Sequence, residues 1–390
     1  MAPENFLDSP ALESLTRQLV AIPSMNPTLV DGDGTGESRV AEFAREWLER
    51  HGVRAWLEDA APGRPNAVGE VGDPGAPALV LCAHLDTVGV AGMTVPPFDV
   101  TRNGDELHGR GTFDMKGAAA ACMCAAAALA AGGFPGRVML ALVADEEYAS
   151  LGAFDFVKRN RAAACILTEA SDHELVLAHK GFVWARVTCR GRAAHGSRWD
   201  LGVSAIAKMA RVVTALDDLD RNVLRRRLGA LVGPASMHCG RIEGGVGLST
   251  YSPSCEIRLE RRYLPEEEEA HVIEEIRGTV LAADPAAEVE ILLARPPFSC
   301  PSDSAIARCV RAASRAVRGG EPRDTGVAFW MDAAVFAASG IPTVDYGPSG
   351  AGAHEDDEWV SLVSITECAR VYHRAAIEFA KTQALAGGAR

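Results

Sequence analysis

Acidic and histidine side chains stand at the ends of several apolar runs. The segments His84–Asp86, Asp145–Glu147 and Glu169 close the runs PALVLCAHLD, RVMLALVADEE and ACILTEA. Asp114 directly precedes an alanine-rich stretch, and His354 follows IPTVDYGP. In open α/β sheets, ligands bind at the carboxyl ends of the strands. Like charges gathered at a buried sheet edge repel each other unless a cation neutralises them, and a set of His nitrogens and carboxylate oxygens without cysteine suits zinc, with cobalt or manganese as less specific choices.

Each of these residues also has an ordinary interpretation when taken alone. A single histidine or acid at a strand end is usually solvated or caps a helix. His84 and Asp86 are two positions apart and share a strand face, where a carboxylate can accept the second ring N–H of a histidine that binds metal. The repetition of the pattern over several strand ends favours a metal site.

The elements that carry these residues alternate between strand and helix. Apolar periodicity predicts helices over 10–20 and 40–51, and the alanine tract 117–131 predicts a packed helix between two buried strands. This alternation indicates an α/β domain with a mostly parallel sheet covered by helices. The pattern returns after residue 297, with helices predicted over 305–317, 331–338 and 362–384 and a strand at IPTVDYGP.

The segment between these two parts has a different pattern. FVWARVTCRG and SCEIRLERRYLP alternate as half-buried strands, AEVEILLARPPF forms a last strand, and helices are predicted over about 202–219 and 266–282. These elements predict a small α+β domain with an antiparallel sheet. The expected organisation is a catalytic domain of residues 1–180 and 297–390, interrupted by an inserted domain of residues 181–296.

Composition narrows the classes of function. The 390 residues carry a net charge of −13, which argues against nucleic acid or an anionic membrane as partner. There is no uninterrupted apolar run of about 18 residues, the length that a membrane span needs. The first nine residues lack the pattern of a signal peptide. The ten cysteines form no CxxC pair, and we expect reduced thiols in a cytoplasmic protein.

The chain resembles the M20 family of metallopeptidases and deacylases, which includes acetylornithine deacetylases, succinyl-diaminopimelate desuccinylases, aminoacylases and enzymes like carboxypeptidase G2. The segments that carry the resemblance are AHLDTV, GRGTFDMKG, ADEEYASLGA, LTEAS, GRAAHGSRWDLGVSAI, RIEGG, ERRYLP and DYGPSGAGAHEDDEWV. It implies a three-layer catalytic domain of the phosphorylase/hydrolase-like type. It also implies a ferredoxin-like inserted domain that serves for dimerisation or as a lid, so a homodimer is expected.

The resemblance also implies roles for single residues. His84 and Glu169 would hold one metal ion, Glu147 and His354 the other, and Asp114 would bridge them. Asp86 would orient His84, Glu146 would be the general base for a metal-bridging water, and the Asp114–Met115 peptide is expected to be cis.

The remaining implied roles concern substrate. His195 would stabilise the oxyanion from the inserted domain, supplied by a second subunit or by domain closure; an ordinary turn residue is the alternative. Arg262 would bind the substrate carboxylate, or form a structural salt bridge with Glu260. Gly350 would let backbone N–H groups approach substrate or would only shape its loop, and Ser249 or Thr250 stands where many relatives have a substrate-binding Asn. Tyr148 replaces a smaller residue of many relatives.

The expected function is dinuclear, metal-dependent hydrolysis of the amide bond of an N-acyl amino acid. A metallo-dipeptidase or carboxypeptidase would use the same metals and base. A non-catalytic metal-binding scaffold is the alternative from another class, against which the presence of Glu146 argues.

Overall fold

The computed structural model describes residues 2–30 and 34–387, and it divides the chain into two compact units. The larger unit comprises residues up to Leu177, Cys300–Thr325 and the chain from Met331 on, and the smaller comprises Ala178–Ser299 with Gly326–Trp330. Each has its own hydrophobic core. The sequence pattern predicts boundaries at 180/181 and 296/297, and it gives no sign that Gly326–Trp330 returns to the smaller unit.

A mixed sheet forms the centre of the larger unit. Its strand order there is β1-β2-β6-β3-β7-β17-β8, and the four central strands β6, β3, β7 and β17 run parallel. The strands are β1 (Arg54–Ala61), β2 (Arg64–Gly72), β3 (Ala78–His84), β6 (Arg137–Val143), β7 (Ala164–Leu167), β8 (Leu175–His179) and β17 (Thr343–Asp345). Every residue of β3 is buried, as its continuous apolar sequence requires. The hairpin of β1 and β2, which pair antiparallel at one edge, was not predicted.

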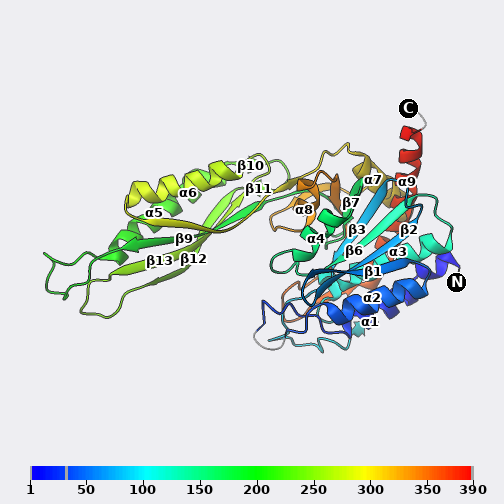
Figure 1. Cartoon of the computed structure of the whole chain (residues 1–390), viewed down its shortest axis with the longest axis horizontal. Coiled ribbons are helices and arrows are strands. Elements are labelled where there is room, and N and C mark those ends of the chain that lie inside the picture. Colours follow the sequence, from blue (N-terminus) through cyan, green and yellow to red (C-terminus); the bar gives the residue numbers. More distant parts are fainter. Residues whose placement is uncertain (1, 31–33, 388–390) are drawn as a thin grey trace. The chain divides into compact units, whose positions relative to one another are not determined.

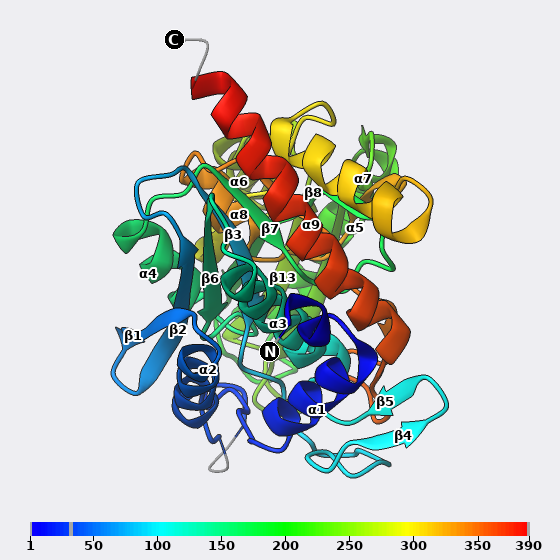
Figure 2. The ribbon, with the colours of Figure 1, turned by 90° about the vertical axis from the view of Figure 1, so that its right-hand side faces the viewer.

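Helices cover both faces of this sheet (Figures 1 and 2). Helices α4 and α8 lie on one face, and α2, α3 and α9 lie on the other, where α1 and α7 pack against them. The bounds are α1 (Ser9–Val20), α2 (Ser38–Arg50), α3 (Gly117–Ala131), α4 (Leu151–Arg159), α7 (Ala305–Arg318), α8 (Ala333–Ala338) and α9 (Leu362–Gly387), with short turns η1 (Pro3–Phe6) and η2 (Thr112–Lys116). The predicted α/β class is thus confirmed.

One segment, Thr112–Ala131, is long and apolar enough to cross a membrane by length and composition alone. It contains α3, and 83% of its most apolar window is buried inside the protein. Its alanine side chains let α3 pack closely against α1, α9 and the sheet. Its apolar character is therefore explained by its place in the core.

A second, four-stranded sheet of the larger unit carries the loop with His354. Its order is β18-β19-β5-β4, with β4 (Thr101–Asn103), β5 (Glu106–His108), β18 (Gly350–Ala351) and β19 (Trp359–Ser361). All three pairings are antiparallel. None of these short strands was predicted, because two or three residues give no periodic signal.

The smaller unit has the order of elements β9-α5-β12-β13-α6-β14, and its antiparallel sheet has the strand order β12-β13-β9-β14. This is the ferredoxin-like arrangement. The main elements are β9 (Gly181–Arg190), α5 (Ala205–Asn222), β12 (Ser236–Gly244), β13 (Ser254–Tyr263), α6 (Glu269–Ala283) and β14 (Glu288–Arg295). Shorter ones are η3 (Leu224–Arg226), β10 (Leu228–Gly229), β11 (Gly233–Pro234) and β15 (Phe298–Ser299). Strand β16 (Asp324–Val327) spans the boundary between the units in the chain and pairs with β8. Figure 1 shows α5 and α6 side by side along the sheet.

Both main helices of the smaller unit begin three residues later than predicted. The helix expected from residue 202 begins at Ala205, because the Ser204 hydroxyl accepts a hydrogen bond from the Ala207 N–H. The helix expected from residue 266 begins at Glu269. There, the Glu267 carboxylate instead accepts from the Leu264 N–H, which closes a turn before the helix.

Candidate metal centre

The register of the parallel strands brings the acidic and histidine residues to one edge of the sheet. His84 ends β3 and lies beside Val143, the last residue of β6, while Leu167, the last residue of β7, pairs with Cys82. Glu147 and Glu169 follow those two strand ends by a few residues. The parallel register therefore brings together His84, Glu147 and Glu169, which are up to 85 positions apart in the sequence.

Two trios of possible ligands form at this edge. His84, Asp114 and Glu169 make one and Asp114, Glu147 and His354 the other, with the ligand atoms of each trio within 4.8 Å of one another. Nε2 of His84 is 2.9 Å from Oδ1 of Asp114 and 3.6 Å from Oε1 of Glu169. Nε2 of His354 is 2.9 Å from Oε2 of Glu147 and 3.2 Å from Oδ2 of Asp114. Asp114 thus faces both trios with different oxygens.

These trios are the ones that the resemblance implied. The expected cis peptide between Asp114 and Met115 is also present. That these five residues act as metal ligands stays a prediction.

The donor set suits divalent cations. The ion pairs of Asp114, Glu147 and Glu169 are with the two histidines. Oε1 of Glu147 is buried and accepts no hydrogen bond from any residue that the structure describes. When the two histidines lose their protons, they no longer compensate the negative charge of these buried carboxylates. Nitrogen and oxygen ligands in this number fit zinc.

The pKa values of the cluster reflect the same excess of negative charge. Burial raises the pKa of Glu169 to about 8, with further increases from Asp114 and Glu147 against the lowering effect of His84. Hydrogen bonds to Asp114 and Glu147 raise the pKa of His354 to about 10. Burial lowers the pKa of His84, but Glu169 and Asp114 raise it more, so it lies well above its usual value. The cluster therefore retains protons that a bound cation would displace.

Glu146 lies next to the ligands without belonging to either trio. Burial raises its pKa well above the usual value for a glutamate, and Glu169 and Glu147 add to the rise while His84 opposes it. A carboxylate whose pKa is raised toward neutrality can both accept and return a proton.

Asp86 holds the acidic loop more directly than it holds His84. Nδ1–H of His84 donates to the backbone carbonyl of Asp86 at 2.9 Å, whereas the Asp86 carboxylate is 3.7 Å away. That carboxylate accepts the backbone N–H groups of Glu146 and Glu147, at 3.1 and 3.2 Å, and the side-chain amide of Asn26 at 2.8 Å. The residue fixes the His84 tautomer through its backbone and the Glu146–Glu147 pair through its side chain.

Several buried charged residues near the centre were not identified from the sequence. Glu358 is fully buried and accepts a hydrogen bond from the Asp114 N–H, and Arg110 pairs with it. Asp332 is also fully buried, and burial raises its pKa to about 7. Arg110 lies in the segment GRGTFDMKG and Glu358 in GAHEDDEWV, but the sequence has four acids close together in the second segment, and only the structure shows that Glu358 is the buried one.

The candidate substrate residues fall into both units. His195, Ser249 and Arg262 belong to the smaller unit, and Gly350 belongs to the larger. A β-bridge joins His195 to Thr250, and the Gly196 N–H donates to the carbonyl of Ser249 at 2.7 Å.

Arg262 and Gly350 have structural partners. Arg262 donates to both carboxylate oxygens of Glu260, at 2.7 and 3.0 Å, and its guanidinium lies over the Phe182 ring. This geometry corresponds to the structural salt bridge that the sequence left open. At Gly350, a Cβ would lie 2.3 Å from the Trp359 carbonyl oxygen, so glycine is required by the close approach of the strands.

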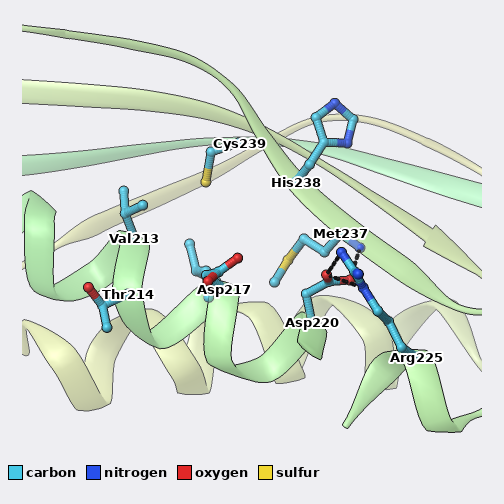
Figure 3. A pocket seen from close by; sticks show the side chains of 9 residues that line it. Val213, Thr214, Asp217, Asp220, Arg225, Met237, His238 and Cys239 are labelled. Atoms are coloured by element: carbon cyan, nitrogen blue, oxygen red, sulfur yellow. Dashed lines mark hydrogen bonds and ion pairs between the residues drawn. The ribbon is translucent and has the colours of Figure 1, made fainter. Parts of the chain in front are cut away.

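The smaller unit also has a pocket of about 430 Å³ between α5 and the edge strand β12 (Figure 3). Asp220 and Arg225 form an ion pair of 2.7 Å at one end of it, and His238 and Cys239 lie on the strand. None of the residues predicted to act on substrate lines this pocket.

Comparisons with known proteins agree on one family. The acetylornithine deacetylase of Myxococcus xanthus is 29% identical over 390 aligned positions, which cover 95% of this chain and 98% of that protein. The N-acetyl-L-citrulline deacetylase of Xanthomonas campestris pv. campestris is 31% identical, covering 75% of this chain and 79% of that protein.

Among solved structures, a dinuclear metal-binding peptidase of the M20 family from Bacillus subtilis superposes with a TM-score of 0.75 at 15% identity, covering 97% of this chain and 99% of that one. The model of peptidase family M20/M25/M40 matches residues 80–378, which include all five candidate ligands, the whole smaller unit and much of the larger one. The chain belongs to peptidase family M20/M25/M40 and is a hydrolase of that family.

Proposed function

We propose that this chain uses two divalent metal ions, zinc in the first place, to hydrolyse the amide bond of an N-acyl amino acid. The observation that carries the proposal is the pair of trios that share Asp114, with Glu146 beside them. The relatives named above as deacetylases support the substrate class.

When bound, the two ions would polarise the amide carbonyl and acidify a water. Glu146 takes the proton of the attacking water and returns it to the leaving amine, which its raised pKa permits. The backbone N–H groups that donate to Asp86 keep the Glu146–Glu147 pair in place during these transfers.

His195 would donate a hydrogen bond to the developing oxyanion. The N–H of Ser197 donates to its Nδ1 at 3.3 Å, and the Ser197 hydroxyl lies 2.8 Å from the same nitrogen. Because Nδ1 accepts, the proton of the neutral ring is on Nε2, where it is available to the oxyanion. His195 would reach the substrate by closure of the units or from a second subunit.

A homodimer is part of the proposal. Strand β12 is an edge of its sheet, and its residues from His238 to Gly244 are exposed, so it could pair with a second copy. Light scattering after size exclusion would give the mass, and a monomer at assay concentration would leave only closure of the units to supply His195.

The test is amine release from a panel of N-acetyl and N-succinyl amino acids and dipeptides, with enzyme reconstituted with zinc or cobalt. Cleavage of N-acyl amino acids with dipeptides untouched supports the deacylase. Cleavage of dipeptides alone would assign the chain to the exopeptidases; the Bacillus subtilis neighbour is described as a peptidase. No turnover with both ions bound would favour a metal-binding scaffold.

A further inference from the structure

We propose that Glu358, neutralised by Arg110, is a positioning residue that holds Asp114 in place and thereby sets the affinity for both metal ions. The inference rests on the proposed metal centre, and it concerns residues outside the two trios. The carboxylate and its counter-ion are both buried in the larger unit.

The backbone around Asp114 needs an external acceptor. Asp114 lies in the irregular turn η2, where Asp114 and Met115 have non-helical backbone angles. A buried backbone N–H without an acceptor costs about as much as a lost hydrogen bond. Oε1 of Glu358 accepts from the N–H groups of Phe113 and Asp114, at 2.9 and 3.0 Å.

The other oxygen of the same carboxylate is also fully used. Oε2 of Glu358 accepts from the Gly111 N–H at 2.9 Å and from the Arg110 guanidinium at 2.8 Å. Four donors converge on one carboxylate whose side chain is 1% exposed. Charge-assisted hydrogen bonds of this kind are about twice as strong as neutral ones. The position of the Asp114 backbone is therefore set by Glu358.

Arg110 extends the contact to two further segments. Its guanidinium donates to the carbonyl of Gly89 at 3.1 Å and to the carbonyl of Glu355 at 3.0 Å. Gly89 follows the strand end that carries His84, and Glu355 follows His354 directly. One buried ion pair thus joins the three segments that supply His84, Asp114 and His354.

The run Glu355–Glu358 shows that the contact is specific to one acid. Glu355, Asp356 and Asp357 are exposed, and Glu358 is fully buried. A glutamine at position 358 would keep the shape of the side chain, but an NH₂ group would replace one of the two accepting oxygens. Whichever way its amide is turned, the NH₂ group faces two donors, either those of Phe113 and Asp114 or those of Gly111 and Arg110.

The test measures zinc binding by the full chain without substrate, by competition with a chromophoric chelator, and records the cobalt absorption spectrum. Glu358→Gln should bind both ions about 10–100-fold more weakly, as for other changes behind metal ligands, and should alter the cobalt spectrum. The matched control is Asp220→Asn in the smaller unit, because Asp220 is also buried and accepts from the Met237 N–H and Arg225 (Figure 3). It should lower the melting temperature and leave zinc binding as in the wild type.

The outcomes separate this inference from the proposed function. Wild-type zinc affinity and an unchanged cobalt spectrum in Glu358→Gln would overturn the positioning role while the metal centre stands. A wild-type protein that binds fewer than two ions would overturn the proposed centre itself. If Glu358→Gln does not fold, Arg110→Lys keeps the charge but loses the fork that reaches Gly89 and Glu355, and it should weaken binding in the same direction.

Discussion

Loading the metal-free protein with zinc should release protons, because the candidate ligands hold them when no cation is bound. The pKa of His354 is raised to about 10 by its hydrogen bonds to Asp114 and Glu147, and burial raises that of Glu169 to about 8. The pKa of His84 also lies well above its usual value, through Glu169 and Asp114 against the effect of burial. Metal ligands must be deprotonated, so binding competes with these protons.

The number of protons follows from these pKa values. At pH 7 a group of pKa about 10 is fully protonated, and one of pKa about 8 is protonated in about nine of ten molecules. The two histidines and Glu169 together give about three protons for two ions, and sharing among neighbours reduces this to about two. The combined affinity for two ions should then rise by about 10²–10³ for each pH unit near neutrality.

The folding stability of the metal-free protein should change with pH in the opposite direction to the metal affinity. Raised pKa values mean that the folded state binds more protons than the unfolded chain, so stability falls as pH rises. For Glu169 the loss runs from its ordinary 4.5 to about 8, and for His354 from 6.5 to about 10. Bound metal should abolish this loss, because the same groups are then deprotonated in the folded state.

Calorimetric zinc titrations in two buffers of different protonation enthalpy give the proton count. We expect two to three protons at pH 7, and about one fewer at pH 9, where Glu169 no longer holds its proton. Release of less than one proton at pH 7 would refute the claim that these ligands are protonated in the metal-free protein. A count independent of pH would refute the assignment to Glu169.

Three further substitutions test separate parts of the site. Glu146→Ala should abolish turnover while both ions still bind, and retained turnover would remove Glu146 from the role of base. Ser197→Ala removes the hydroxyl but keeps the backbone N–H that donates to Nδ1, so it should lower kcat up to about tenfold and partly mix the tautomers of His195, which two-bond ¹H–¹⁵N spectra report; a pure Nε2–H tautomer in the variant would show that the hydroxyl does not set it. Gly350→Ala should destabilise the fold by about 1–3 kcal/mol in chemical denaturation, because its Cβ would meet the Trp359 carbonyl and the Phe113 ring, and an unchanged midpoint would contradict that crowding.

The sequence predicts the fold where elements are long and periodic. The buried strand that ends at His84 and the alanine-rich helix were both recognisable from a continuous apolar run and from helix propensity. The β1–β2 hairpin was missed, since β1 is partly exposed without regular alternation, and the buried β2 has the sequence RPNAVGEVG, which lacks a continuous apolar run. Gly326–Trp330 returns to the smaller unit through tertiary contacts that no local pattern encodes.

The grouping of the candidate ligands could be predicted from the sequence, whereas the Arg110–Glu358 pair behind them could not. Parallel strands place their carboxyl ends together, so residues that end successive apolar runs are expected to meet, as His84 and Glu169 do. The pairing of Arg110 with Glu358 joins segments 248 positions apart, and it depends on a loop path that periodicity does not determine.

The buried carboxylates of this region fall into two physical classes, and the classes separate support from function. Asp86 and Glu358 are surrounded by donors of the protein, mainly backbone N–H groups, which satisfy their carboxylate oxygens without any added cation. Asp114, Glu147 and Glu169 pair with histidines, which can give up their protons and turn the same atoms toward a metal. The first class positions the second: Glu358 holds the backbone of Asp114, and Asp86 holds that of Glu147. Both classes are acids near strand ends or in loops, so composition cannot distinguish them, whereas a count of donors on each carboxylate does.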